Sequence, residues 1–163
     1  LSTNDAGLIL AIGFFGTSIA GILGGRLLNN LGSRRLGFAG IVITATGLCA
    51  VSLVNGPDDI PWMLLALFIQ GIGTGLFQTS YMYSITGMLP SDQRGVSGSI
   101  TMLTRTIGVV SGVTILTLVF SWLNAAGNEF QESFKFIFNL VGGGLFLFLL
   151  TTLPWPQVWF RKI

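Results

Sequence analysis

The chain has 163 residues, of which 51% are hydrophobic and 9% are charged, with a formal net charge of +2. A soluble domain carries about a quarter charged residues, so this composition excludes a water-soluble fold and favours an integral membrane protein. The net charge is too small to indicate nucleic-acid binding. The chain has no histidine and one cysteine, Cys49, so we expect no metal site, no disulfide and no cofactor.

Five apolar runs follow one another along the chain, separated by polar segments, and each is long enough for the roughly 20 helical residues that cross a bilayer. They predict membrane-spanning helices over residues 6–28, 36–54, 61–88, 96–123 and 134–153. The fold class expected is therefore an all-α, polytopic transmembrane helix bundle. Because the first residue is Leu1 rather than methionine, we expect the chain to begin inside a longer protein.

Charged residues are sorted between the two ends of these helices. One end and the C-terminal tail hold the basic residues Arg26, Arg34, Arg35, Arg94, Arg161 and Lys162; the other holds Asp5, Asp58, Asp59, Glu129, Glu132 and Lys135. Short cytoplasmic loops are enriched in lysine and arginine, so we expect the N-terminus outside and the C-terminus in the cytoplasm. The membrane expected is the cytoplasmic one, that is, the inner or plasma membrane. Trp62, Trp122, Trp155 and Trp159 fall at the expected interfaces.

Arg105 lies deep in the helix predicted over 96–123, roughly 15 Å along the axis from Gly95 and near the middle of the bilayer. A guanidinium at that depth is costly unless it faces protein or water. One interpretation is a contact with substrate or an anion, or with a carboxylate on helices outside this segment. The other is a structural anchor that bonds the carbonyl groups of neighbouring helices. No Asp or Glu lies within the five apolar runs.

Polar stripes mark two neighbouring helices. Gln70, Thr74, Gln78 and Tyr81 recur at spacings of four, four and three residues, so they share one helix face. Such a face either lines an aqueous cavity or forms hydrogen bonds across a helix interface. The next helix carries a similar stripe of Ser97, Thr101, Arg105, Gly108 and Gly112. The candidate cavity residues are Gln70, Thr74, Gln78, Tyr81, Thr101 and Arg105.

Glycines at four-residue spacing indicate where helices pack. The pairs are Gly21 with Gly25, Gly71 with Gly75 and Gly108 with Gly112. We expect Gly71, Gly75, Gly108 and Gly112 to lie at helix contacts with no direct role in chemistry. One function consistent with these faces is that of a non-catalytic membrane assembly protein, which binds partner helices through them.

The segment from Gly95 to Gly98 resembles the GxSG motif around the nucleophile of rhomboid intramembrane proteases. That serine needs a histidine to accept its proton, and this chain has none. We therefore expect no enzyme activity, with Ser97 as a residue in the first turn of its helix.

Two segments resemble a transporter family. Residues 25–35 (GRLLNNLGSRR) are similar to the cytoplasmic signature of the major facilitator superfamily, a glycine, an acid four residues on, then a glycine and basic residues. Residues 89–95 (LPSDQRG), leading into 105–112 (RTIGVVSG), resemble the penultimate helix of its multidrug/proton antiporter branch.

The resemblance implies that the chain is the C-terminal part of a secondary transporter whose N-terminal half is missing. It implies proton-coupled efflux of small lipophilic or drug-like compounds by alternating access. The partners implied are membrane lipids, a small-molecule substrate, protons and the missing half, which would supply the proton-coupling carboxylates. Helices 6–28, 61–88 and 96–123 would border the central cavity.

The same resemblance implies a cytoplasmic gate. Its residues would be Gly25, Arg26, Asn29, Gly32, Arg34, Arg35 and Arg94. Asn29 stands where the family has aspartate, so it can accept a hydrogen bond but supplies no charge, which weakens the gate contact. Arg34, Arg35 and Arg94 are equally explained as anchors of the positive-inside kind.

Overall fold

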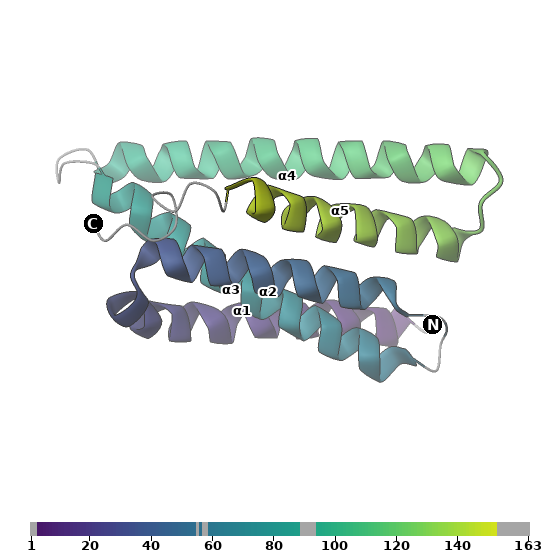
Figure 1. The fold of residues 1–163 in the computed structure, drawn as a ribbon, viewed down its shortest axis with the longest axis horizontal. Coiled ribbons are helices and arrows are strands. Elements are labelled where there is room, and N and C mark those ends of the chain that lie inside the picture. Colours follow the sequence, from purple (N-terminus) through teal and green to yellow (C-terminus); the bar gives the residue numbers. More distant parts are fainter. Residues whose placement is uncertain (1–2, 55, 57–58, 89–93, 153–163) are drawn as a thin grey trace.

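The computed structural model describes residues 3–54, 56, 59–88 and 94–152 (Figure 1), with the side chains of all of these except 3–6, 88, 94 and 97. This part of the chain forms α1 (Thr3–Leu31), α2 (Ser33–Ser52), α3 (Ile60–Met88), α4 (Arg94–Ala125) and α5 (Phe130–Thr152). All five of these described helices are long and apolar enough to cross a membrane, which confirms the expected helix bundle. Their ends lie within four residues of the ranges expected from sequence.

The link between α1 and α2 is shorter than the one expected from sequence. Both helices extend toward each other, so that Asn29 lies in the last turn of α1 and Arg34 in the first turn of α2. Gly32 alone separates them, with φ 77°, a left-handed conformation that residues with side chains rarely adopt. Its amide donates to the Leu28 carbonyl (2.9 Å) and its carbonyl accepts from the Leu36 amide (3.1 Å). A single glycine therefore turns the chain.

α3 lies between α1 and α2 and contacts both over most of its length. Glycines make this possible. A Cβ added at Gly71 would collide with the Gly13 carbonyl of α1, and one added at Gly73 would collide with the Thr44 amide nitrogen of α2. Backbones can approach this closely only where side chains are absent, so α1, α2 and α3 form a tight three-helix unit.

The three helices also share a small apolar core. It contains one buried residue from each helix, Ala20, Leu36 and Leu76. Hydroxyl groups add bonds between helices, because Thr17 Oγ1 donates to the Gly71 carbonyl (3.1 Å) and Ser80 Oγ donates to the Ser33 carbonyl. Polar side chains thus join helices whose surroundings offer no water.

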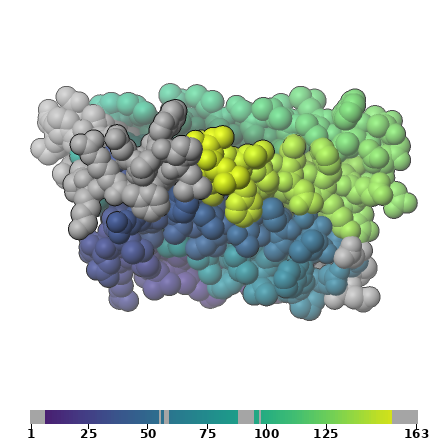
Figure 2. Space-filling model, in the orientation of Figure 1, coloured from purple at the N-terminus to yellow at the C-terminus, as the bar shows by residue number. Residues whose placement is uncertain are grey.

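α5 packs on α2, whereas α4 has few contacts with the rest of the bundle (Figure 1). Ser52 Oγ of α2 donates to Asn139 Oδ1 of α5 (3.0 Å), and a Cβ at Gly142 would lie 2.6 Å from Cys49 Sγ. α4 forms one edge of the molecule (Figure 2). Among the described side chains of α4 only that of Thr101 is buried, so α4 presents most of its surface to its surroundings.

Gly73→Ala is expected to destabilise the bundle, because the added Cβ would meet the Thr44 amide and lie 2.7 Å from the Gly40 carbonyl oxygen. Overpacking of this kind lowers the free energy of unfolding by about 1–3 kcal/mol. Gly21→Ala is the matched control, since no atom lies within 4 Å of its added Cβ. In a helix, alanine is favoured over glycine by about 1 kcal/mol. Thermal unfolding followed by size-exclusion chromatography should give a lower midpoint for Gly73→Ala only; equal midpoints would contradict the close approach.

Candidate functional site

The predicted polar stripe of α3 lies on the side of the helix opposite the buried Leu76. Its four members, Gln70, Thr74, Gln78 and Tyr81, are all half-buried. Gln70 Nε2 donates to Thr74 Oγ1 (3.0 Å), and Thr74 Oγ1 donates to the Gln70 carbonyl (2.9 Å). The stripe thus occupies a face that the three-helix core does not use, and half of it is already ordered by its own hydrogen bonds.

Aromatic packing fixes the end of this stripe. The Tyr81 ring stacks on the Phe77 ring, with centroids 6.2 Å apart and planes 16° from parallel. A Cβ at Gly47 of α2 would lie 2.6 Å from the Gln70 amide nitrogen, so α2 holds the backbone at the other end. The polar groups therefore sit on a rigidly packed helix.

The stripe of α4 is arranged differently. Thr101 is buried, with 6% of its surface exposed, but Arg105 is exposed, and the Ser97 side chain lies outside the described part. No atom lies within 4 Å of a Cβ added at Gly108 or Gly112, whereas Gly71 and Gly75 of α3 each meet backbone atoms of α1.

The two stripes do not close into one site within these helices. α3 and α4 lie close only where the last residues of α3 approach the first residues of α4, and the two helices diverge from there (Figure 1). Arg105 and Gln78 lie on these diverging helices, and no hydrogen bond joins their two side chains. A shared site for Arg105 and Gln78 stays a prediction that involves more than the described residues.

The predicted gate residues gather at one end of the bundle. Figure 1 shows the α1–α2 turn at the same end as the last turn of α3 and the first turn of α4. Arg26, Asn29 and Arg35 are exposed there and Arg34 is half-buried with an interaction partner; a Cβ at Gly25 or Gly32 meets no atom within 4 Å. Arg94 is the first residue of α4, and its side chain lies outside the described part.

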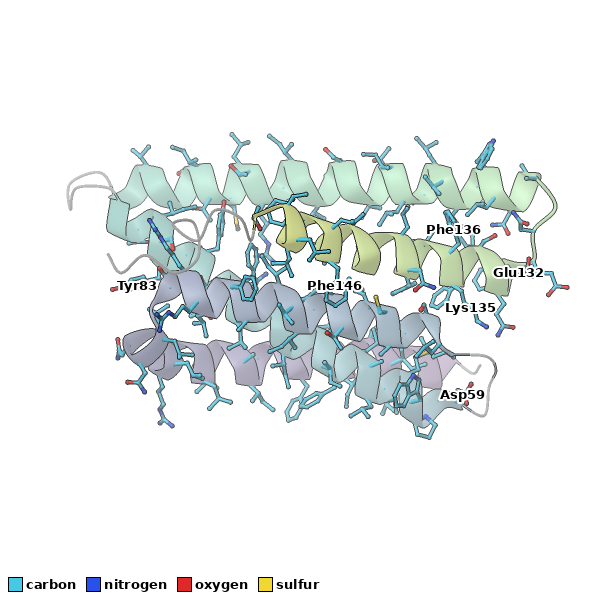
Figure 3. All side chains as sticks on the ribbon, in the orientation of Figure 1. Asp59, Tyr83, Glu132, Lys135, Phe136 and Phe146 are labelled. Carbon is cyan, nitrogen blue, oxygen red and sulfur yellow. The ribbon has the colours of Figure 1, made fainter. Side chains whose placement is uncertain are left out.

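The opposite end carries the acidic residues. Asp59, Glu132 and Lys135 lie together at that end of the molecule (Figure 3). Trp62 and Trp122 are exposed near the same end, and Trp62 Nε1 donates to the Ala50 carbonyl (2.9 Å). Apart from Arg105, the described charges are therefore separated along the helix axes in the way the sequence predicted.

One cavity in the described structure was not anticipated. It has a volume of about 210 Å³, lies between α4 and α5, and is lined by Leu116, Thr117, Phe120, Phe134, Ile137 and Phe138. None of the predicted site residues lines it. The phenylalanine-rich start of α5 is the feature of the sequence that could have indicated this cavity. The ring centroids of Phe134 and Phe138 lie 4.5 Å apart there.

Sequence reasoning also missed several close contacts. Gly40, Gly47 and Gly73 each come within 3 Å of a neighbouring backbone if a Cβ is added, although none belongs to a four-residue glycine pair. The spacing of seven between Gly40 and Gly47, two helical turns, was the available signal. Among the described residues, no group of three or more His, Cys, Asp or Glu is placed to hold a metal ion.

Known transporters are similar to this chain. A probable triacylglyceride transporter of Mycobacterium leprae is 29% identical over 126 residues, which covers 71% of this chain and 25% of the relative. Hexose transporter 1 of Toxoplasma gondii is 32% identical over 122 residues, with coverages of 73% and 20%. A multidrug resistance protein of Cronobacter sakazakii is 28% identical over 131 residues, with coverages of 80% and 28%.

The chain therefore spans between 20% and 28% of the length of these relatives. No solved structure matches it. The family model of the Major Facilitator Superfamily matches residues 1–160, which include both polar stripes and the arginine-rich end of the bundle. This integral membrane chain belongs to the Major Facilitator Superfamily.

Proposed function

We propose that the chain is the C-terminal part of a secondary active transporter that exports small lipophilic or drug-like compounds in exchange for protons. The observation that carries the proposal is the family match over residues 1–160. The relatives named above are called transporters of triacylglycerides and hexose and a multidrug resistance protein. The triacylglyceride name fits a lipophilic compound and the multidrug resistance name fits a drug-like one, which supports that substrate class. The family match does not favour the alternative of a membrane assembly protein.

In this proposal the polar stripe of α3 and the face of α4 that carries Thr101 and Arg105 line the substrate pathway. Amide and hydroxyl groups at this depth are unfavourable against lipid and favourable against water or a polar ligand. Gln70 and Thr74 bond each other, while Gln78 and Tyr81 add an amide and a phenol on the same face. Because glycine contacts fix α3 between α1 and α2, these groups are held in place before a ligand arrives.

Proton coupling requires a group that gains and loses a proton near neutral pH. The chain has no histidine, and its six acidic residues all lie between helices or in the first turn of a helix. The coupling carboxylates therefore belong, in this proposal, to an N-terminal half outside residues 1–163. Rocking of the two halves around the pathway would expose it alternately to the two sides.

The arginine-rich end is the cytoplasmic end in this proposal. Arg26, Arg34 and Arg35 lie there together, as the positive-inside rule requires of a cytoplasmic face. With Asn29, Gly32 and Arg94 they would form the gate, in which Asn29 contributes a hydrogen bond in place of a charge.

Cysteine labelling tests this orientation. In a Cys49→Ala background, Asn30→Cys lies at the arginine-rich end of α1 and Asn128→Cys in the turn between α4 and α5; both positions are exposed. A membrane-impermeant maleimide added outside intact cells should label Asn128→Cys and reach Asn30→Cys only after the membrane is opened. The reverse pattern would invert the proposed topology.

A matched pair of tyrosines tests the pathway. Tyr81 lies on the polar stripe, whereas Tyr83 is exposed on the other side of α3 near its arginine-rich end (Figure 3). Loss of one hydrogen bond to a ligand weakens binding roughly three- to tenfold. Tyr81→Phe should therefore lower export by the complete protein by that factor, and Tyr83→Phe should leave it unchanged.

The assay is proton-driven export of a fluorescent lipophilic dye from proteoliposomes, with and without a protonophore. Dye movement that is insensitive to the protonophore would contradict proton coupling. Equal effects of the two phenylalanine variants would remove the α3 stripe from the pathway.

A further inference from the structure

Arg105 differs in position from every other charged residue of the chain. It lies roughly 16 Å along the axis from the start of α4 and roughly 30 Å from its end. All other charged residues lie within six residues of the end of a described helix or outside these helices. A guanidinium in the hydrocarbon region costs several kcal/mol in an apolar setting, so its position needs a compensating interaction.

The described helices do not supply a counter-charge. Arg105 is exposed, and no acidic residue lies beyond the first turn of any described helix. The positions one and two turns further along the same face are Gly108 and Gly112, where an added Cβ would meet no atom within 4 Å. The exposed guanidinium has five N–H donors, whose arrangement matches the planar oxygen pair of a carboxylate or phosphate.

The polar groups of α3 are neutral. Gln70, Thr74, Gln78 and Tyr81 offer amide and hydroxyl groups, which can bond a ligand but do not balance a positive charge on it. Arg105 would repel a cationic ligand near the same pathway, and the described helices place no carboxylate beyond their first turns to offset that repulsion. The charges on these helices thus select against cations.

We infer that the transported compound carries one acidic group, a carboxylate or phosphate, which the Arg105 guanidinium binds, on an otherwise lipophilic body. The inference rests on the proposed transport function and narrows its substrate class. Gly108 and Gly112 leave room beside the guanidinium for the acidic group to approach α4, and the apolar surface of α4 suits the rest of the compound.

A matched pair of fluorescent probes tests this inference on the complete protein. Dansylglycine carries a carboxylate at neutral pH, and dansylglycinamide is the same molecule with a neutral amide. A hydrogen-bonded charge pair strengthens binding by about ten- to a hundredfold, so the wild type should bind dansylglycine more tightly than the amide by that factor. Arg105→Gln should reduce the ratio of the two affinities to near one, and Arg105→Lys should keep part of it.

Lys135→Gln is the control, because it removes a positive charge at the opposite end of the bundle and should leave the ratio unchanged. Equal affinities in the wild type, or an unchanged ratio in Arg105→Gln, would overturn the inference. If Arg105→Gln does not fold, the wild-type ratio and that of Arg105→Lys decide the matter. Loss of both probes in a folded Arg105→Gln protein would also overturn it and make Arg105 a structural anchor.

Proton-driven export separates this inference from the proposed function. Export of the amide as fast as the acid would leave transport standing and remove the anion preference. If neither probe nor a set of lipophilic dyes moves under a proton gradient, the transport proposal itself fails.

Discussion

The close backbone contact of α3 with α1 and α2 is the constraint on which the rest of the bundle depends. In a membrane the lipid tails are as apolar as the side chains, so burial of leucine gives little gain and helices associate through close packing and hydrogen bonds. Gly71 and Gly73 allow that approach on two sides of one helix, and Thr17 and Ser80 bond across it. With these two sides taken, the orientation of α3 is fixed, and its polar face is left to the third side.

α4 differs from α3 in what surrounds it. It is apolar around most of its circumference and has few neighbours among the described helices. It also carries the Arg105 guanidinium, well away from either end of the helix. Lipid satisfies the apolar surface but not Arg105, which is exposed in the described part of the chain. The free energy of this helix in the membrane therefore depends on what lies against the face that carries Arg105.

Much of the fold could be predicted from the sequence, because membrane spans need only length and apolarity. Helix identity, order and the separation of charge follow from these and the positive-inside rule. Helix ends were less accurate, since α1 and α2 continue through Asn29 and Arg34 until a glycine with positive φ turns the chain. Helix partners were not predictable in full: pairs of glycines look alike in sequence, yet Gly71 meets α1 and Gly108 meets nothing described. Which glycine pair forms a contact depends on how the neighbouring helices pack. The same holds for the candidate site: residue spacing predicted the polar stripe of α3, but it could not predict where Arg105 lies relative to that stripe.

The one-residue link at Gly32 has a mechanical consequence. A residue contributes two soft torsions, and here the flanking hydrogen bonds to Leu28 and Leu36 occupy both sides of the joint. Such a link allows the angle between α1 and α2 to change a little, but it cannot lengthen. A shift of α1 along the membrane normal must therefore move α2 as well. The basic side chains of Arg26, Arg34 and Arg35 on either side of Gly32 would then move together. Their movement would be transmitted to α3 through its contacts with α1 and α2.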